Sequence, residues 1–272
     1  MQPARTEQHD DLKGSPERFG YSWDQFNTLT PEQERQFRLW TVHLSPEADW
    51  KGKAFLDGGC GAGRNSYWAM SYGAKSCVAI DLDDRSLDAA RRNLQPFPGA
   101  EIRKCSIYDI PFKDTFDIAF SIGVIHHLND PGLAVRKLAA ATKPGGNVLI
   151  WVYGYENLEF YVNVLNPLRK LLFSWMPLAI VRLLAHAPAA LLWIVLRLGF
   201  TRLEYMKLLR MFSYPHIHHV CFDQMLPRTA NYWRKEEAMA LLEQAGLRDV
   251  RAKWVNEVSW SVIGTKSASS IE

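Results

Sequence analysis

The fold is decided by the stretch Phe55-Leu56-Asp57-Gly58-Gly59-Cys60-Gly61-Ala62-Gly63-Arg64, in which a short apolar run leads directly into a glycine-rich turn. Glycine permits positive φ and lets a ligand approach the backbone closely, so a strand that enters such a turn before a helix is typical of a ligand-binding edge. The spacing Gly59-x-Gly61-x-Gly63 departs from the dinucleotide pattern, because Arg64 stands where its last glycine would be. Asp57 suits a cationic amine better than a pyrophosphate, which it would repel.

The sequence around this turn alternates between apolar strands and amphipathic helices. We expect strands at residues 54–57, 76–81, 101–105, 116–121 and 147–153, helices at 65–72, 84–94, 132–142 and 235–244, and a terminal antiparallel hairpin at 247–254 and 258–265. Strands that alternate with helices form a parallel sheet with right-handed crossovers. The sequence therefore predicts an α/β fold with a doubly wound, mostly parallel seven-stranded sheet.

A second acid, Asp81, stands at the end of the second predicted strand. It follows Asp57 by 24 residues (81 minus 57), near the spacing expected for a carboxylate that binds both hydroxyls of a ribose. The turn together with the two acids, in the order strand, turn, helix, strand, predicts a site for a nucleoside that carries a cationic group.

Several stretches resemble the class I S-adenosylmethionine (SAM)-dependent methyltransferase family, and they occur in the family's order. They are the glycine turn, Ala79-Ile80-Asp81, Ile110-Pro111-Phe112, Phe116-Asp117, Gly123-Val124-Ile125-His126-His127-Leu128 and Lys143-Pro144-Gly145-Gly146. The resemblance implies a Rossmann-like methyltransferase fold, SAM as the cofactor, and methyl transfer to an oxygen or nitrogen atom of an acceptor.

The resemblance also assigns cofactor contacts by position. The methionine part of SAM would lie against Asp57, Gly59, Cys60, Gly61, Ser121 and Ile122, and the nucleoside against Asp81, Leu82, Ser106 and Ile107. Ser106 stands where the family usually has an acid near the adenine amine. The stretch Arg18 to Trp23 resembles an N-terminal segment that some bacterial members fold over SAM.

Catalysis of methyl transfer needs alignment of donor and acceptor and, for a hydroxyl acceptor, a base. His126 and His127 follow the fourth predicted strand, at the edge of the sheet where ligands bind, and we expect His126 to act as the base. His127, Tyr21 and Asp223 are further catalytic candidates. His216, His218 and His219 precede Asp223, but their spacing suits a strand and no partner cluster is evident, so we predict no metal.

The chain divides by pattern into four parts. Residues 1–50 are predicted to form an aromatic N-terminal cap after a polar tail (1–15), 51–153 the SAM-binding core, 154–232 an inserted helical lid, and 233–266 the last helix and hairpin. The insertion is very apolar at 168–198, and its apolar runs, 171–181 and 183–196, are each too short to span a bilayer. It could cover an apolar acceptor, contact a membrane surface peripherally through 168–200, or form a homodimer interface.

Composition limits the function classes. The net charge of +3 gives little support to nucleic-acid binding, and four scattered cysteines suggest a reducing compartment, the cytoplasm. We therefore predict a cytoplasmic enzyme with a small, partly apolar acceptor and no nucleic-acid partner. Two alternatives remain open: non-methyl chemistry with SAM as the substrate, for example cyclisation that releases methylthioadenosine, and methylation of a lipid-linked or membrane-surface substrate.

Overall fold

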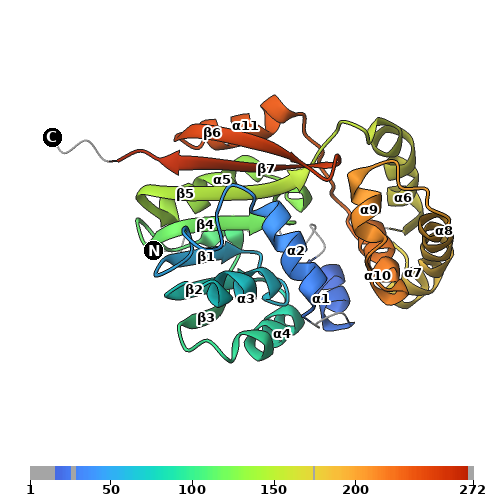
Figure 1. Cartoon of the computed structure of the whole chain (residues 1–272), viewed down its shortest axis with the longest axis horizontal. Helices are drawn as coiled ribbons and strands as arrows, with labels where there is room; N and C mark the ends of the chain where they lie inside the picture. Colours follow the sequence, from blue (N-terminus) through green and yellow to red (C-terminus); the bar gives the residue numbers. More distant parts are fainter. Residues whose placement is uncertain (1–15, 26–28, 174, 269–272) are drawn as a thin grey trace, which may run out of the picture.

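A computed structural model describes residues 16–25, 29–173 and 175–268, so the predicted polar tail and the cap residue Phe26 lie outside the described residues. Its centre is a seven-stranded sheet in the order β3-β2-β1-β4-β5-β7-β6, in which β7 runs antiparallel to both of its neighbours (Figure 1). The strands are β1 (Ala54–Gly58), β2 (Ser76–Asp81), β3 (Ala100–Lys104), β4 (Phe116–Ile122), β5 (Thr142–Tyr153), β6 (Leu247–Val255) and β7 (Ser259–Lys266). The predicted mostly parallel sheet with a terminal hairpin is confirmed.

Helices cover both faces of the sheet, as expected for a doubly wound fold. One face carries α5 (Pro131–Ala141) and α11 (Lys235–Glu243), and the other carries α2 (Pro31–Trp40), α3 (Arg64–Ser71) and α4 (Asp84–Leu94). The start of α2 is fixed by Thr30, whose backbone N–H donates to Gln33 Oε1 at 3.0 Å. Asp83 caps α4 by accepting the backbone N–H groups of Arg85 and Ser86.

An aromatic cluster fixes α2 on the sheet. Phe37 from α2 and Trp50 from the following loop meet Phe55 of β1 and Phe120 of β4, with ring centroids 5.5 to 6.3 Å apart. All four side chains are fully buried. Part of the N-terminal aromatic content therefore belongs to the core that supports the central strands.

The insertion between β5 and α11 is helical and forms the end of the molecule away from β3 (Figure 1). Its elements are a π-helical turn (Tyr161–Leu165), α6 (Asn166–Phe173), α7 (Leu178–Leu184), α8 (His186–Arg197), α9 (Glu204–Leu209) and α10 (Tyr214–Met225). The N-terminal helix α1 (Pro16–Gln25) joins it to the core, because α1 packs on both α4 and α10. Arg18 of α1 donates to the carbonyl of Phe173 at 2.9 Å.

Two local predictions are wrong. The strand expected at 147–153 begins at Thr142, so Lys143-Pro144-Gly145-Gly146, which follows the end of α5, lies within β5. The pairing with β4 is irregular there, since Phe116 pairs with Thr142 and Ile118 already pairs with Asn147. The segment His216 to His218, whose alternation suggested a strand, lies in helix α10. In both places the tertiary partner, β4 or the helices packed around α10, decides the local structure.

Candidate functional site

The glycine turn lies at the carboxyl end of β1 and is bonded to β2. The backbone N–H groups of Gly59 and Cys60 both donate to the carbonyl of Ile80, at 2.9 and 2.8 Å. Gly59 has φ +85°, and a Cβ atom there would lie 2.4 Å from Cγ2 of Val124. Positive φ and the close approach together require glycine at this position, so the turn presents its backbone without a side chain in front of it.

Asp57 lies beneath the turn and is fully buried. Its Oδ2 accepts the hydroxyl of Ser66 at 2.7 Å, while Oδ1 has no hydrogen-bond partner. Burial raises the pKa of this carboxyl to about 7; the Ser66 hydrogen bond opposes that shift and the charge of Asp81 adds to it. The residue is not part of the cavity lining described below, and its hydrogen bond to Ser66 joins β1 to α3. Its contact with the methionine group stays a prediction.

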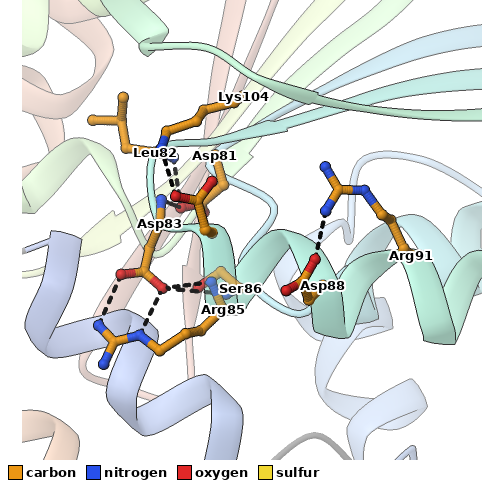
Figure 2. Close-up of polar contacts among 9 residues, drawn as sticks. Asp81, Leu82, Asp83, Arg85, Ser86, Asp88, Arg91 and Lys104 are labelled. Atoms are coloured by element: carbon orange, nitrogen blue, oxygen red, sulfur yellow. Dashed lines mark hydrogen bonds and ion pairs between the residues drawn. The ribbon is translucent and has the colours of Figure 1, made fainter.

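Asp81 ends β2 and is held by three backbone donors. Figure 2 shows it with two of them, Leu82 and Asp83. Its Oδ2 accepts from Gly61 N at 2.9 Å, and its Oδ1 accepts from Leu82 N at 2.8 Å and from Asp83 N at 3.1 Å. Burial raises the pKa of the carboxyl, and these three hydrogen bonds oppose that shift. The side chain therefore has a fixed orientation and also ties the glycine turn to the start of α4.

One cavity of about 970 Å³ begins at this turn and continues into the insertion. Most of the predicted cofactor residues line it: Gly59, Cys60, Gly61, Asp81, Leu82, Ser106, Ile107 and Ile122. Ser121 does not, because it is fully buried and donates its hydroxyl to the carbonyl of Gly58 at 2.7 Å, which corrects its predicted contact with methionine. Ser106 opens a 3-10 turn (Ile107–Asp109) by accepting from Tyr108 N at 3.1 Å.

The part of the cavity inside the insertion is mainly apolar. Its lining there comes from several helices and includes Leu165, Leu168, Leu172, Leu184, Leu192 and Leu209. A volume of about 970 Å³ lies at the upper end of the range of roughly 300–1,000 Å³ found for small-molecule sites. The cavity has room for a nucleoside at the sheet edge and for a second, apolar molecule beside it.

His126 lies outside the cavity lining. Its side chain is fully buried, its ring stacks on Tyr153 with centroids 3.7 Å apart, and neither ring nitrogen has a hydrogen-bond partner. Burial lowers the pKa of His126 well below its ordinary value. The geometry thus does not bring this predicted base to the site, because packing against Tyr153 turns the ring into the core.

His127 does line the cavity. Its Nδ1 lies 2.9 Å from the carbonyl oxygen of Thr229. A carbonyl only accepts hydrogen bonds, so Nδ1 carries the proton and Nε2 keeps a lone pair. Burial lowers the pKa of His127 to about 4, which leaves the ring neutral at pH 7.

A second polar group lies on α10 inside the same cavity. His219 Nε2 and Asp223 Oδ2 are 3.2 Å apart, one helical turn from each other, and Arg64 and His216 line the cavity with them. Burial lowers the pKa of Arg64 to about 10, and the charge of Asp223 opposes that shift. Asp223 thus lines the cavity, and its catalytic role stays a prediction. Arg64 and the pairing of Asp223 with His219 were missed, although the i,i+4 spacing shows the pair once α10 is known to be a helix.

Tyr21 lies outside the cavity lining. Its ring packs edge-on against Phe222, with centroids 6.2 Å apart. Phe19, two residues earlier on α1, lines the cavity instead and packs against His127 at 4.8 Å. Among residues 16–25, 29–173 and 175–268 no group of three or more His, Cys, Asp or Glu side chains could hold a metal ion.

The glycine turn and its surroundings suit the cofactor that the motifs imply. Asp57 Oδ1 is a buried acceptor without a partner, and Gly59 leaves open the space that a side chain would fill. The turn and Ile122 would hold the methionine part, Asp81 and Leu82 the ribose and one side of the adenine, and Ser106 with Ile107 the other side of the base.

Comparisons with known proteins bear on the domain and the fold. Residues 56–150 match a family model described as "Methyltransferase domain". A tRNA U34 carboxymethyltransferase of Pseudomonas paraeruginosa (strain DSM 24068 / PA7) is 31% identical over 132 residues, which cover 47% of this chain and 40% of that protein. The chain thus matches less than half the length of such relatives.

Two solved structures share the fold over most of the chain. One is 1,6-didemethyltoxoflavin-N1-methyltransferase of Burkholderia thailandensis with bound 1,6-didemethyltoxoflavin and S-adenosylhomocysteine, at TM-score 0.58 and 14% identity, covering 98% of this chain and 93% of that one. The other is the [4+2]-cyclase SpnF, at TM-score 0.53 and 11% identity, covering 86% and 82%. At these identities the likeness shows the fold alone.

Proposed function

Since residues 56–150 match a methyltransferase domain, we propose that this chain is a class I SAM-dependent methyltransferase that transfers a methyl group to an oxygen or nitrogen atom of a small, partly apolar acceptor. The observation that carries the proposal is the cavity of about 970 Å³, which joins the cofactor residues at the sheet edge to an apolar space inside the insertion. SAM supplies a methyl group on a sulfonium, an excellent leaving group, so the protein must chiefly align the two reactants.

His127 is the proposed base for a hydroxyl or protonated amine acceptor. Its Nε2 lone pair is available because Thr229 holds the proton on Nδ1, and a general base of this kind contributes about 10²–10⁴-fold to the rate. Gly123 and Val124, just before it, line the cavity with Ile122. His127 therefore stands near the residues assigned to the methionine part of SAM and takes the role first predicted for His126.

The polar group on α10 is proposed to orient the acceptor. Neutral His219 donates its Nε2 proton to Asp223, which fixes the ring, and Arg64 supplies a positive charge beside the pair. These polar atoms lie within an otherwise apolar part of the cavity. An acceptor with one polar end and an apolar body fits this distribution.

Two alternatives to this proposal are a nucleic-acid acceptor and chemistry other than methyl transfer. The relatives named for tRNA U34 make the predicted absence of a nucleic-acid partner an open question. The fold shared with a protein named as a cyclase keeps non-methyl chemistry, with SAM as substrate, as the alternative. The four free cysteines fit the reducing conditions of the cytoplasm, which we propose as its location.

The test is an incubation of the full chain with methyl-labelled SAM and either an organic-solvent extract of cells or purified tRNA. We expect label in the extract and release of S-adenosylhomocysteine, with the His127→Gln variant binding SAM normally but transferring little label. Release of methylthioadenosine would contradict methyl transfer, and label confined to tRNA would contradict the small acceptor.

A further inference from the structure

The helices α6, α7 and α8 expose many large apolar side chains. Trp175, between α6 and α7, is 82% exposed and Leu171 on α6 is 76% exposed. Further exposed members, none of which lines the cavity, are Ile180, Leu183, Leu191, Ile194 and Leu198. Figure 1 shows these three helices together at the end of the molecule, with α8 far from the sheet. Proteins that stay in water rarely gather so much exposed apolar surface, so this face indicates a partner.

The segment Leu178–Arg197, which contains α7 and α8, is by length and composition able to cross a membrane, with a mean hydropathy of 2.0. This corrects the expectation of two separate short runs, since only Ala185 separates the two helices. One side of the segment nevertheless packs against the rest of the protein, since α8 packs along α10. The buried residues of this side are Val181, Ala185, Ala189 and Leu196. A segment held along one side in this way lies on an apolar phase rather than crossing it.

The charged residues of the same region indicate which kind of apolar surface this face would bind. Residues 160–203 contain no Asp or Glu but five basic residues, Arg169, Lys170, Arg182, Arg197 and Arg202. Arg169 is buried, whereas Arg197 and Arg202 are exposed next to Leu198 and Phe200. Apolar side chains flanked by basic ones complement anionic lipid headgroups over an acyl layer.

Two other occupants fit less well. A second copy of the chain would bring the same acid-free basic face against itself in a two-fold contact, with like charges opposed. A nucleic acid would bind the arginines but would leave the leucines and Trp175 exposed, because its contacts go mainly to phosphates.

We propose that the exposed face of α6–α8 rests on an anionic bilayer surface, and that the acceptor enters the cavity from that bilayer. The second part rests on the proposed function; the first does not. Leu184, Pro188 and Leu192 line the cavity, while their neighbours Leu183, Leu191 and Ile194 face outward. Helices α7 and α8 thus have the apolar part of the cavity on one side and the bilayer on the other. An apolar acceptor would pass from the acyl layer into this apolar part of the cavity.

The test is vesicle flotation of the full chain with phosphatidylcholine alone and with phosphatidylcholine–phosphatidylglycerol mixtures. We expect binding to the mixed vesicles. The double variant Leu183→Gln/Leu191→Gln should bind at least about tenfold more weakly, since burying a leucine side chain contributes about 1.5–3 kcal/mol. Arg197→Gln/Arg202→Gln should bind about 30-fold more weakly, because each basic residue near an anionic surface contributes about 1 kcal/mol, roughly fivefold.

The matched control is Val42→Gln, which changes a 44% exposed apolar residue that follows α2 and should leave binding unchanged. Circular dichroism must show that each variant is folded. Equal binding of wild type and the leucine variant, or no binding to mixed vesicles, would overturn the proposal. Dimerisation lost in the leucine variant would assign the face to a second copy, and tRNA binding lost in the arginine variant would assign it to RNA. Because flotation needs neither SAM nor an acceptor, its outcome is independent of whether methyl transfer is found.

Discussion

Replacing Asp57 by asparagine should remove one component of the pH dependence of stability. Burial raises the pKa of this carboxyl from 3.8 to about 7 in the folded chain. Between these two values the folded chain holds a proton that the unfolded chain has released, so stability is present at low pH and is lost as pH rises to 7. One pH unit corresponds to about 1.36 kcal/mol, so this group alone costs wild type about 3 kcal/mol between pH 5 and pH 8.

The assay is urea unfolding of wild type and Asp57→Asn at a series of pH values, without cofactor. Buried neutral histidines such as His127, with its pKa lowered to about 4, lose stability in the opposite direction as pH falls. They are common to both proteins and cancel in the difference. We expect the variant to gain about 3 kcal/mol relative to wild type from pH 5 to pH 8. Ser66→Ala, which removes the hydroxyl bonded to Oδ2 at 2.7 Å, should enlarge the wild-type dependence. A difference between wild type and Asp57→Asn that stays constant with pH would refute the reasoning.

Three further predictions follow from the same geometry. Gly59→Ala should weaken SAM binding at least about tenfold in calorimetry, because positive φ and the 2.4 Å approach to Val124 disfavour a side chain there; wild-type affinity would contradict the assigned turn. His127→Gln should lower kcat by about 10²–10⁴-fold at unchanged SAM affinity. The wild-type rate should be constant from pH 8 to pH 5 and fall near pH 4, where the His127 ring becomes protonated. A fall near pH 6.5 would mean that another residue is the base. Phe120→Ala should lower the free energy of unfolding by about 3–5 kcal/mol, measured in urea, since its ring is fully buried among Phe37, Trp50 and Phe55; a loss below 1 kcal/mol would mean that the cluster does not support the central strands.

The sheet could be predicted because its local signals agree with its tertiary structure. The expected strand at 76–81 and helix at 84–94 have the observed bounds. Burial on both faces makes β2 a continuous apolar run, and Asp83 caps the helix that follows. Sequence pattern and packing specify the same element there.

The catalytic side of the site could be predicted only in part, because side-chain direction depends on distant partners. His126 and His127 are neighbours in one motif, yet their rings point to different places. The His126 ring stacks on Tyr153 in the core, and the His127 ring is bonded to the Thr229 carbonyl at the cavity. Likewise, the pairing of His219 with Asp223 exists only because α10 is a helix. In the insertion, apolar residues occur on both the inner and outer sides of α7 and α8, so periodicity gave no hint of which side is buried.

The central claim is that the glycine turn and Asp81 bind SAM. Calorimetric titration with S-adenosylhomocysteine tests it directly, for wild type and for Asp81→Ala. We predict one site per chain in wild type and affinity lower by at least about tenfold in the variant, since a hydrogen bond to a charged group contributes about 1.5–3 kcal/mol. Absence of binding to the folded wild-type chain, or equal affinity in the two proteins, would contradict the account.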